Sequence, residues 1–175
     1  HGGALGYQGI EQSIAIEFDS FFNSNWDDSN NQVSVLQDGD IRNALAAANT
    51  AYDLNGGNLL TAWIDYDGES DLLEVYLADS LNKPETSLLA LNIDLAGVVG
   101  EQAFFGFSAA TGGRVNNHDI LNWELTSNSS LIPAANDLTQ LESIIDFEDF
   151  ADVSQLNFNG NAGQANDSLR LTTNK

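Results

Sequence analysis

Short runs of alternating apolar and polar residues, separated by turn residues, constrain the fold of this chain more than any other feature. Over residues 13–19, three large apolar side chains fall on one face of a strand: Ile14, Ile16 and Phe18. Because successive strand residues point to opposite faces, Glu17 and Asp19 share the other face. This pattern predicts a half-buried β-strand.

Further β-rich runs follow along the chain and are predicted as strands: 33–36, 59–66, 72–77, 88–93, 103–109 and 119–125. Asp67 and Gly68 supply the turn chemistry between the second and third of these runs. The Ala-rich run 41–48 is the one convincing local helix. Many short strands with Gly- and Asn-rich turns predict an all-β, antiparallel sandwich.

The charge of the chain excludes several classes of partner. Among 175 residues there are 5 Lys+Arg and 26 Asp+Glu, which gives a net charge of -21. Affinity for nucleic acid comes largely from basic residues that neutralise phosphate, so we expect no nucleic-acid partner. No apolar run approaches the ~20 residues of a spanning helix, so we expect no membrane insertion. The chain has no cysteine, which excludes disulfides and thiolate nucleophiles.

Oxygen-bearing side chains gather around the end of the first predicted strand. Glu17 and Asp19 project from one face with Cβ atoms about 7 Å apart. The following loop adds the amide of Asn23 and the carboxylate of Asp27. Carboxylate, amide and carbonyl oxygens are the ligands that Ca²⁺ prefers. The same residues also fit an acidic loop that stays solvated, and spacing alone leaves both interpretations open.

Two enzymatic interpretations fail on missing residues. Glycoside hydrolysis on such a strand needs a second glutamate after Glu17 and Asp19, and the positions for it hold Phe21 and Phe22. A Ser-His-Asp hydrolase is also excluded, because this chain lacks the Gly-x-Ser-x-Gly elbow that carries the nucleophile. His118 is expected to cap or pair at the start of a strand. The chain is therefore predicted not to be an enzyme.

Four blocks in order carry a family resemblance across residues 2 to about 125. They are Gly-Gly-Ala-Leu-Gly-Tyr at 2–7, Ile-Glu-Phe-Asp with its loop at 16–19, Trp-Ile-Asp-Tyr-Asp at 63–67, and Gly-Phe-Ser-Ala-Ala-Thr-Gly at 106–112 leading to His-Asp-Ile-Leu-Asn-Trp. The chain resembles the legume-type (L-type) lectins, in their bacterial branch. The resemblance implies a concanavalin-like jelly-roll β-sandwich that binds sugar, without catalysis, beside Ca²⁺ and often a transition-metal ion.

The resemblance also implies ligands for the metals. Asp19, the Phe21 carbonyl, Asn23 and Asp27 match the calcium ligands, while Glu17, Asp19 and Asp27 match the transition-metal side. That second site normally uses a histidine where this chain has Gln32. Glutamine is a hard oxygen donor and a poor substitute for imidazole, so this position holds either no second ion or another calcium.

For sugar, the resemblance implies that Asn23 donates hydrogen bonds to a hydroxyl and Phe21 stacks on the ring. Backbone groups of Gly2 or Gly3 meet the sugar from one side. The loop that contains Gly113 and Arg114 sets specificity from the other.

The order of the family's segments differs in this chain. Residues 156–172 resemble the family's N-terminal strands but lie near the C-terminal end, which indicates a circular permutation. The family's Ala-Asp-Gly segment, whose Asp binds sugar, would lie before residue 1. We expect a lectin-like domain at 1–125, a linker at 126–143 and further strands at 144–175. Strands from a neighbouring chain or repeat would complete the sandwich, through self-association or a sibling chain.

These features together predict a secreted, extracellular, calcium-dependent carbohydrate-binding module of an adhesive protein. The alternative is a structural subunit of an extracellular fibre or sheath that uses the same fold, stabilised by calcium and strand exchange.

Overall fold

The computed structural model describes residues 2–100, 102–113, 116–126, 145–147, 163–164 and 169–171. The chain divides into two compact units. One comprises residues 3–107, and the other comprises residues 1–2 with 108–175.

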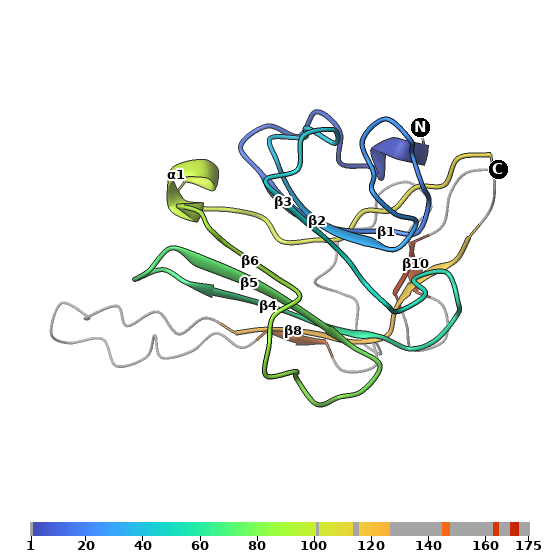
Figure 1. Ribbon diagram of the computed structural model, residues 1–175. Coiled ribbons are helices and arrows are strands. Elements are labelled where there is room, and N and C mark those ends of the chain that lie inside the picture. Colours follow the sequence, from blue (N-terminus) through green and yellow to red (C-terminus); the bar gives the residue numbers. More distant parts are fainter. Residues whose placement is uncertain are drawn as a thin grey trace, which may run out of the picture. The chain divides into compact units, whose positions relative to one another are not determined.

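Two antiparallel sheets form the unit of residues 3–107. The first has the order β1-β2-β3, and the second has the order β4-β5-β6. The bounds are β1 Ile14–Asp19, β2 Gln32–Gln37, β3 Ala46–Asn49, β4 Thr61–Asp67, β5 Leu72–Ala78 and β6 Leu89–Asn92. The two sheets form separate layers in Figure 1. They confirm the strands predicted at 13–19, 33–36, 59–66, 72–77 and 88–93.

The hydrophobic core lies between these sheets. Val33 and Val35 of β2 pack with Val75 of β5, and none of the three has exposed surface. The other buried members of the cluster are Leu73, Leu77, Leu89 and Ile93. Burial of apolar area at about 25 cal/mol per Å² makes this cluster the main source of the unit's stability. The predicted antiparallel sandwich is confirmed.

β2 is buried on its other face as well. Leu36 packs there in a second cluster with Tyr7 and Ile41. The Tyr7 hydroxyl accepts a hydrogen bond from the Ser13 hydroxyl at 2.9 Å. The N-terminal segment therefore covers the outer face of the β1-β2-β3 sheet, on the side of Glu17 and Asp19.

A glycine contact fixes this segment. The Gly9 N–H donates to the Gly39 carbonyl at 3.1 Å. Gly39 has φ 70°, and a Cβ there would lie 2.3 Å from the Gly9 nitrogen. Glycine is required at this position on both counts.

The prediction of a helix at 41–48 was wrong. Residues 46–49 form β3, in which Ala46 and Ala48 pack on the core while Ala47 is exposed. Alanine's helix propensity is a weak preference that pairing with β2 overrides. The short helices are η1 (Gly2–Ala4) and α1 (Leu95–Val99), and Asp94 caps α1 by accepting from the Gly97 N–H at 2.8 Å.

The second unit contains two small antiparallel sheets among its described residues, β10-β11-β7 and β8-β9. Their bounds are β7 His118–Ile120, β8 Trp123–Leu125, β9 Ile145–Phe147, β10 Gly163–Gln164 and β11 Leu169–Leu171. The single strand predicted at 119–125 is thus two strands that belong to different sheets. Within the range 144–175, where further strands were predicted, the described residues form β9, β10 and β11. Residues 127–143 of the predicted linker and 156–162 lie outside the described residues.

The strand predicted at 103–109 was wrong. Residues 102–111 have no regular secondary structure, and no sheet of the described residues includes them. A β-rich composition makes a strand only where a neighbouring strand takes its backbone hydrogen bonds. Phe104 and Phe105 are consequently exposed.

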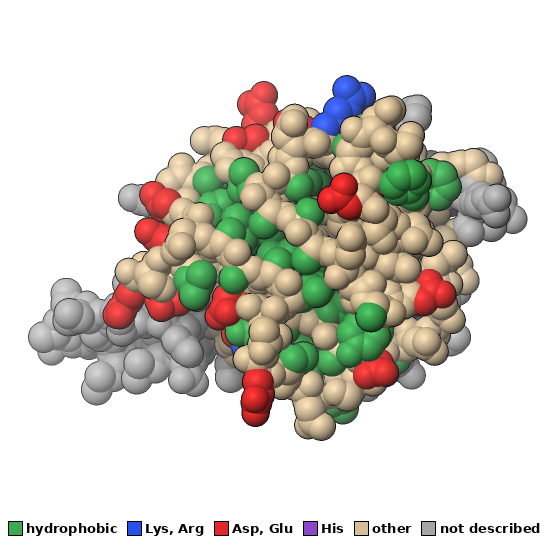
Figure 2. All heavy atoms as spheres, viewed as in Figure 1, with side chains coloured by type: hydrophobic (Ala, Val, Ile, Leu, Met, Phe, Trp, Pro, Cys, Tyr) green, Lys and Arg blue, Asp and Glu red, His purple; other side chains and the backbone are tan. Residues whose placement is uncertain are grey.

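Apolar surface reaches the outside along the edges of the residue 3–107 sandwich. Figure 2 shows apolar side chains gathered in a stripe over the region of β3 and β6. Phe18, predicted to share the core face with Ile14 and Ile16, is 38% exposed, and Ile64 of β4 is 49% exposed. Both lie on strands at the edges of the sheets that the described residues form. In the described part of the chain, no helix combines the length and apolar character needed to cross a membrane.

Candidate functional site

The β1-β2 hairpin brings the predicted metal ligands together. Its antiparallel register sets Asp19 opposite Gln32 and Glu17 opposite Ser34. Side chains two residues apart share a face, so all four lie on the outer face of the sheet. The loop between the strands, residues 20–31, contains Asn23 and Asp27.

Two carboxylates hold this loop through backbone N–H groups. Asp19 Oδ1 accepts from the Phe21 N–H at 2.8 Å, and Asp27 Oδ2 accepts from the Asn23 N–H at 2.6 Å. The Asn23 carbonyl accepts in turn from the N–H groups of Trp26 and Asp27, both at 3.0 Å. The loop is a tight turn built around Asp19, Asn23 and Asp27.

The three acidic side chains lie close together without a countercharge, Asp19 buried and Glu17 and Asp27 half-buried. The pKa of Glu17 is raised to about 7, first by burial and then by the charges of Asp19 and Asp27. Burial also raises the pKa of Asp19 and of Asp27, against the hydrogen bonds that their oxygens accept. Among the described residues, no Lys or Arg forms an ion pair with any of the three. This arrangement favours a bound cation.

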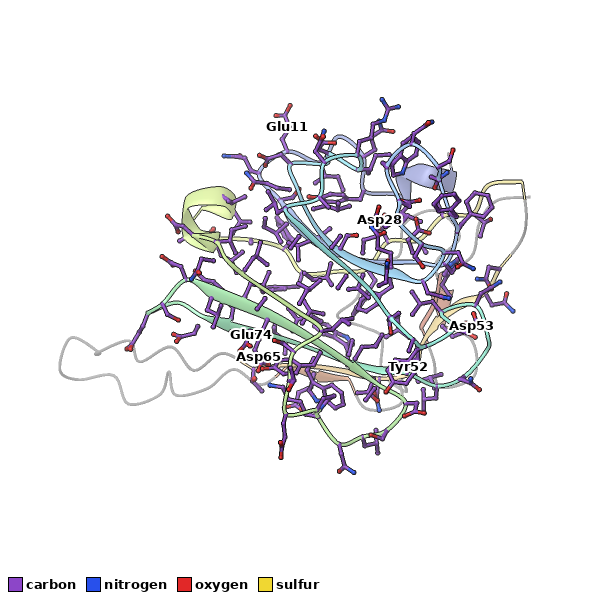
Figure 3. All side chains as sticks on the ribbon, viewed as in Figure 1. Glu11, Asp28, Tyr52, Asp53, Asp65 and Glu74 are labelled. Atoms are coloured by element: carbon purple, nitrogen blue, oxygen red, sulfur yellow. The ribbon has the colours of Figure 1, made fainter. Side chains whose placement is uncertain are left out.

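A line of hydrogen bonds connects the end of the loop to Glu17. The Asp28 N–H donates to Gln32 Oε1 at 2.9 Å, and Gln32 Nε2 donates to Ser34 Oγ at 3.0 Å. The Ser34 hydroxyl bonds to the Glu17 carboxylate and lowers its pKa. Figure 3 labels Asp28 at the loop. Gln32 therefore positions neighbours with both ends of its amide.

The donor set fits calcium through its chemistry and not through carboxylates alone. Within the described ranges, no group of three or more His, Cys, Asp or Glu side chains is arranged to hold a metal ion. A metal here would also need amide and backbone oxygens, such as those of Asn23 and Phe21. Calcium accepts such mixed oxygen ligands at 6–8 positions, whereas a transition metal favours imidazole or thiolate.

The predicted sugar-binding residues are distributed over both units. Phe21 is 59% exposed at the loop, as stacking on a sugar requires, and Asn23 is half-buried beside it. A Cβ at Gly3 would lie 3.8 Å from both Asn23 Oδ1 and a Trp26 ring atom. A Cβ at Gly2 would lie 2.3 Å from the Gly112 nitrogen, next to the exposed Gly113. Arg114 lies outside the described residues.

Three residues near this site were not found from the sequence. Ser34 contacts Glu17 only across paired strands, so the register had to be known. Phe22 is 49% exposed beside Phe21, and Trp26 lies against Gly3. An aromatic residue inside a loop of polar residues was the available signal for Trp26.

His118 begins β7, as predicted, and pairs with Leu171 of β11 in the register. Its Nδ1 atom is buried and has no hydrogen-bond partner among the residues that the structure describes. The residue does not belong to the acidic loop.

Comparison with known proteins gives a family match over most of the chain. The legume lectin domain family matches residues 7–141. Agglutinin-2 of Cladrastis kentukea is 32% identical over 120 residues, which are 68% of this chain and 40% of that protein.

Two other relatives are a receptor kinase and a seed lectin named for the sugar it binds. A probable L-type lectin-domain containing receptor kinase S.7 of Arabidopsis thaliana is 31% identical over 159 residues, 83% of this chain and 23% of the kinase. The 2-acetamido-2-deoxy-D-galactose-binding seed lectin 2 of Cytisus scoparius is 30% identical over 127 residues, 69% of this chain and 50% of the lectin. The chain spans half or less of the length of these relatives.

Proposed function

Because this chain belongs to the legume lectin domain family, we propose that it is a calcium-dependent carbohydrate-binding module of an extracellular adhesive protein. The family match and the nearly all-β structure make it a lectin domain with a concanavalin-like β-sandwich fold. The family binds carbohydrate and is not enzymatic. To this family property we add three proposals: calcium dependence, secretion and a role in adhesion.

One observation carries the proposal: an exposed aromatic ring and an amide stand on a loop that is held by the carboxylates of Asp19 and Asp27. Phe21 offers its ring and Asn23 its side-chain amide. An aromatic face with a few fixed polar groups is the usual composition of a small-ligand site. Gly2, Gly3, Gly113 and Arg114 are the further sugar-binding residues that we propose.

We assign calcium to Asp19, the Phe21 carbonyl, Asn23 and Asp27. A bound calcium supplies positive charge that offsets the buried carboxylates, and it fixes the loop before sugar binds. Preorganisation of this kind lowers the entropic cost of binding. Glu17 and Gln32 are the residues that would contribute oxygens to a second calcium. In the structure the Gln32 amide instead positions Asp28 and Ser34.

We also propose that the segment order is permuted and that the chain represents the bacterial branch. Support for the permutation comes from β11, which pairs with β7 although the two strands are about fifty residues apart in the sequence. Residues 144–175 would then supply strands to the lectin-like part at 1–125, across a linker at 126–143.

A second candidate function is supported by the open edges of the sandwich. Phe18 and Ile64 are exposed on the edge strands β1 and β4. Exposed apolar edge strands favour pairing with another chain. On this hypothesis the chain is a structural subunit of a fibre or sheath, and a second copy adds the missing strands.

The test of the lectin proposal is a glycan array probed with the purified chain, in Ca²⁺ and again in EDTA. The array includes 2-acetamido-2-deoxy-D-galactose, since one relative is named for binding it. We expect binding in Ca²⁺ that EDTA abolishes. Phe21→Ala should weaken binding about tenfold with little loss of stability, because one stacked aromatic contributes about 1 kcal/mol or more. Phe22→Ala is the matched control.

Binding that survives EDTA would remove calcium from the proposal. Absence of binding in both buffers, together with a concentration-dependent rise in mass by light scattering, would favour the structural subunit. If Phe21→Ala lowers stability and leaves sugar affinity unchanged, Phe21 packs inside the fold and does not stack on sugar.

A further inference from the structure

We propose that Arg42 extends the sugar site toward a carboxylate, so that the ligand is an acidic glycan containing a uronic-acid residue. The inference rests on the proposed function, because it names the class of sugar that the same loop binds. Three observations carry it: the position of Trp26, the stacking of Arg42 on Trp26, and the absence of an ion pair for Arg42 within the described part of the chain.

Trp26 lies at the edge of the proposed sugar loop. Its backbone N–H donates to the Asn23 carbonyl at 3.0 Å, which places it one turn after the sugar-binding amide. A ring atom of Trp26 and the Asn23 side chain lie at similar distances, 3.8 and 3.8–3.9 Å, from the Cβ position of Gly3. Gly3, Asn23 and Trp26 therefore form one continuous surface.

Arg42 extends this surface with a positive charge. Its guanidinium carbon lies 5.3 Å from the centroid of the Trp26 ring, within the range of a cation–π contact. Where a guanidinium covers an aromatic ring with its face, its N–H groups remain at its edge. A carboxylate can accept two of these N–H groups in a bidentate pair.

The guanidinium of Arg42 has no carboxylate partner of its own among the described residues. The chain has 26 acidic residues for 5 basic ones, yet Arg42 forms no ion pair in the part that the structure describes. Asp40 is attracted to the Arg42 charge without forming an ion pair with it, and its oxygens instead accept from the backbone N–H groups of Arg42 and Asn43 and from Asn43 Nδ2 at 2.7 Å. Its oxygens are engaged in this turn, which leaves the Arg42 side chain available.

The strongly acidic surface does not prevent an anionic sugar from reaching Arg42. Charges separated by more than about 8 Å are largely screened at physiological ionic strength, so the distant carboxylates contribute little. The local contact decides, and there the exposed Arg42 cation lies over the Trp26 ring.

The experiment compares paired monosaccharides by titration calorimetry in Ca²⁺. The pairs are galactose with galacturonate and glucose with glucuronate, with 2-acetamido-2-deoxy-D-galactose as a neutral reference and galactose 6-sulfate as a different anion. The variants are Arg42→Gln and Arg42→Lys. Lys83→Gln is the matched control, because it also removes one positive charge, but from the Asp65 ion pair on the other sheet.

We expect the wild-type chain to bind a uronate more tightly than its neutral partner. Arg42→Gln should weaken uronate binding about 3- to 10-fold and change neutral-sugar binding less than twofold. The uronate affinity of Arg42→Lys should lie between those of the wild type and Arg42→Gln, because lysine keeps the charge and loses the bidentate geometry. Lys83→Gln should bind like the wild type, and all variants should melt like it in EDTA.

Equal affinity for a uronate and its neutral partner, or an Arg42→Gln variant with unchanged uronate affinity, would overturn the inference and leave the lectin proposal standing. Equal binding of the sulfate ester, lost in Arg42→Gln, would overturn the assignment to a carboxylate. Absence of any sugar binding in Ca²⁺, on these pairs and on the array, would overturn both proposals.

Discussion

At the scale of single residues, the distinctive feature is a glutamate whose pKa is raised to about 7, first by burial. Glu17 is half-buried beside two other carboxylates and receives one opposing hydrogen bond, from Ser34. The raised pKa carries a cost for stability, because the charged form is disfavoured in the folded chain.

The metal-free chain should lose stability as the pH rises. The pKa of Glu17 rises from its ordinary value of 4.5, which the unfolded chain retains, to about 7 in the folded chain. Between these values the folded chain binds more protons, so the free energy of unfolding falls from about pH 4.5 to about pH 7. Urea unfolding in EDTA at several pH values checks this. Glu17→Gln should flatten the fall, and a slope as steep as that of wild type would contradict the prediction.

The exposed glutamate Glu11 provides the control (Figure 3). Glu11→Gln removes a carboxylate of the same charge from the N-terminal segment and does not touch the acidic loop. We expect it to keep the wild-type slope.

Asp19 should be the residue on which the effect of calcium depends. Asp19→Asn removes a charged oxygen from the proposed calcium ligands while its size is kept. We expect calcium to raise the melting temperature of the wild type and to have little effect on the variant. In EDTA the two should differ less, because removing a buried charge relieves repulsion and compensates for the weaker hydrogen bond to Phe21. Equal calcium shifts would remove Asp19 from the ligand set.

At the scale of elements, β3 shows how pairing decides structure where local preference is weak. Ala46 and Ala48 point to the core and Ala47 is exposed, which is the period of a strand. A run of alanines has no apolar–polar contrast, so the sequence alone did not reveal this alternation.

Substitutions in β3 test its alternation. Ala48→Glu should place a charge against the core and lower the free energy of unfolding by about 2 kcal/mol or more. Ala47→Glu, one residue away on the exposed face, should change it by less than about 0.5 kcal/mol. Both are measured by urea unfolding at pH 7. Similar losses in the two variants would contradict the strand.

The fold could be predicted from the sequence where alternation or turn chemistry was strong. β1, β2 and the β4-β5 hairpin are of this kind, with Asp67 and Gly68 at the turn. α1 was not predicted, because a helix of five residues is too short to show a periodic pattern. The strand predicted at 103–109 is absent, because β-rich composition does not provide a partner strand. Ligand types at the site followed from residue chemistry. The hydrogen bonds of Gln32 and Ser34 did not, because they depend on strand register.

At the scale of the whole molecule, the net charge of -21 opposes compaction. Like charges repel in the folded state, and salt screens them. Raising NaCl from about 0.01 to about 0.1 M shortens the Debye length from about 30 to about 10 Å. We expect the melting temperature in EDTA to rise by about 2–4 °C, equivalent to about 1 kcal/mol for a domain of this size. A melting temperature that stays constant or falls with added salt would show that charge repulsion contributes little to the stability of the folded chain.

The two different faces of β2 have a consequence for folding fidelity. Val33 and Val35 face the apolar core, whereas Gln32 and Ser34 face the carboxylates. A slip of β2 by one residue against its neighbours would exchange these sets and bury amide and hydroxyl groups among leucines. Mispaired chains are therefore penalised on both faces at once. The polar residues of the site therefore also specify the register in which β2 pairs with its neighbours.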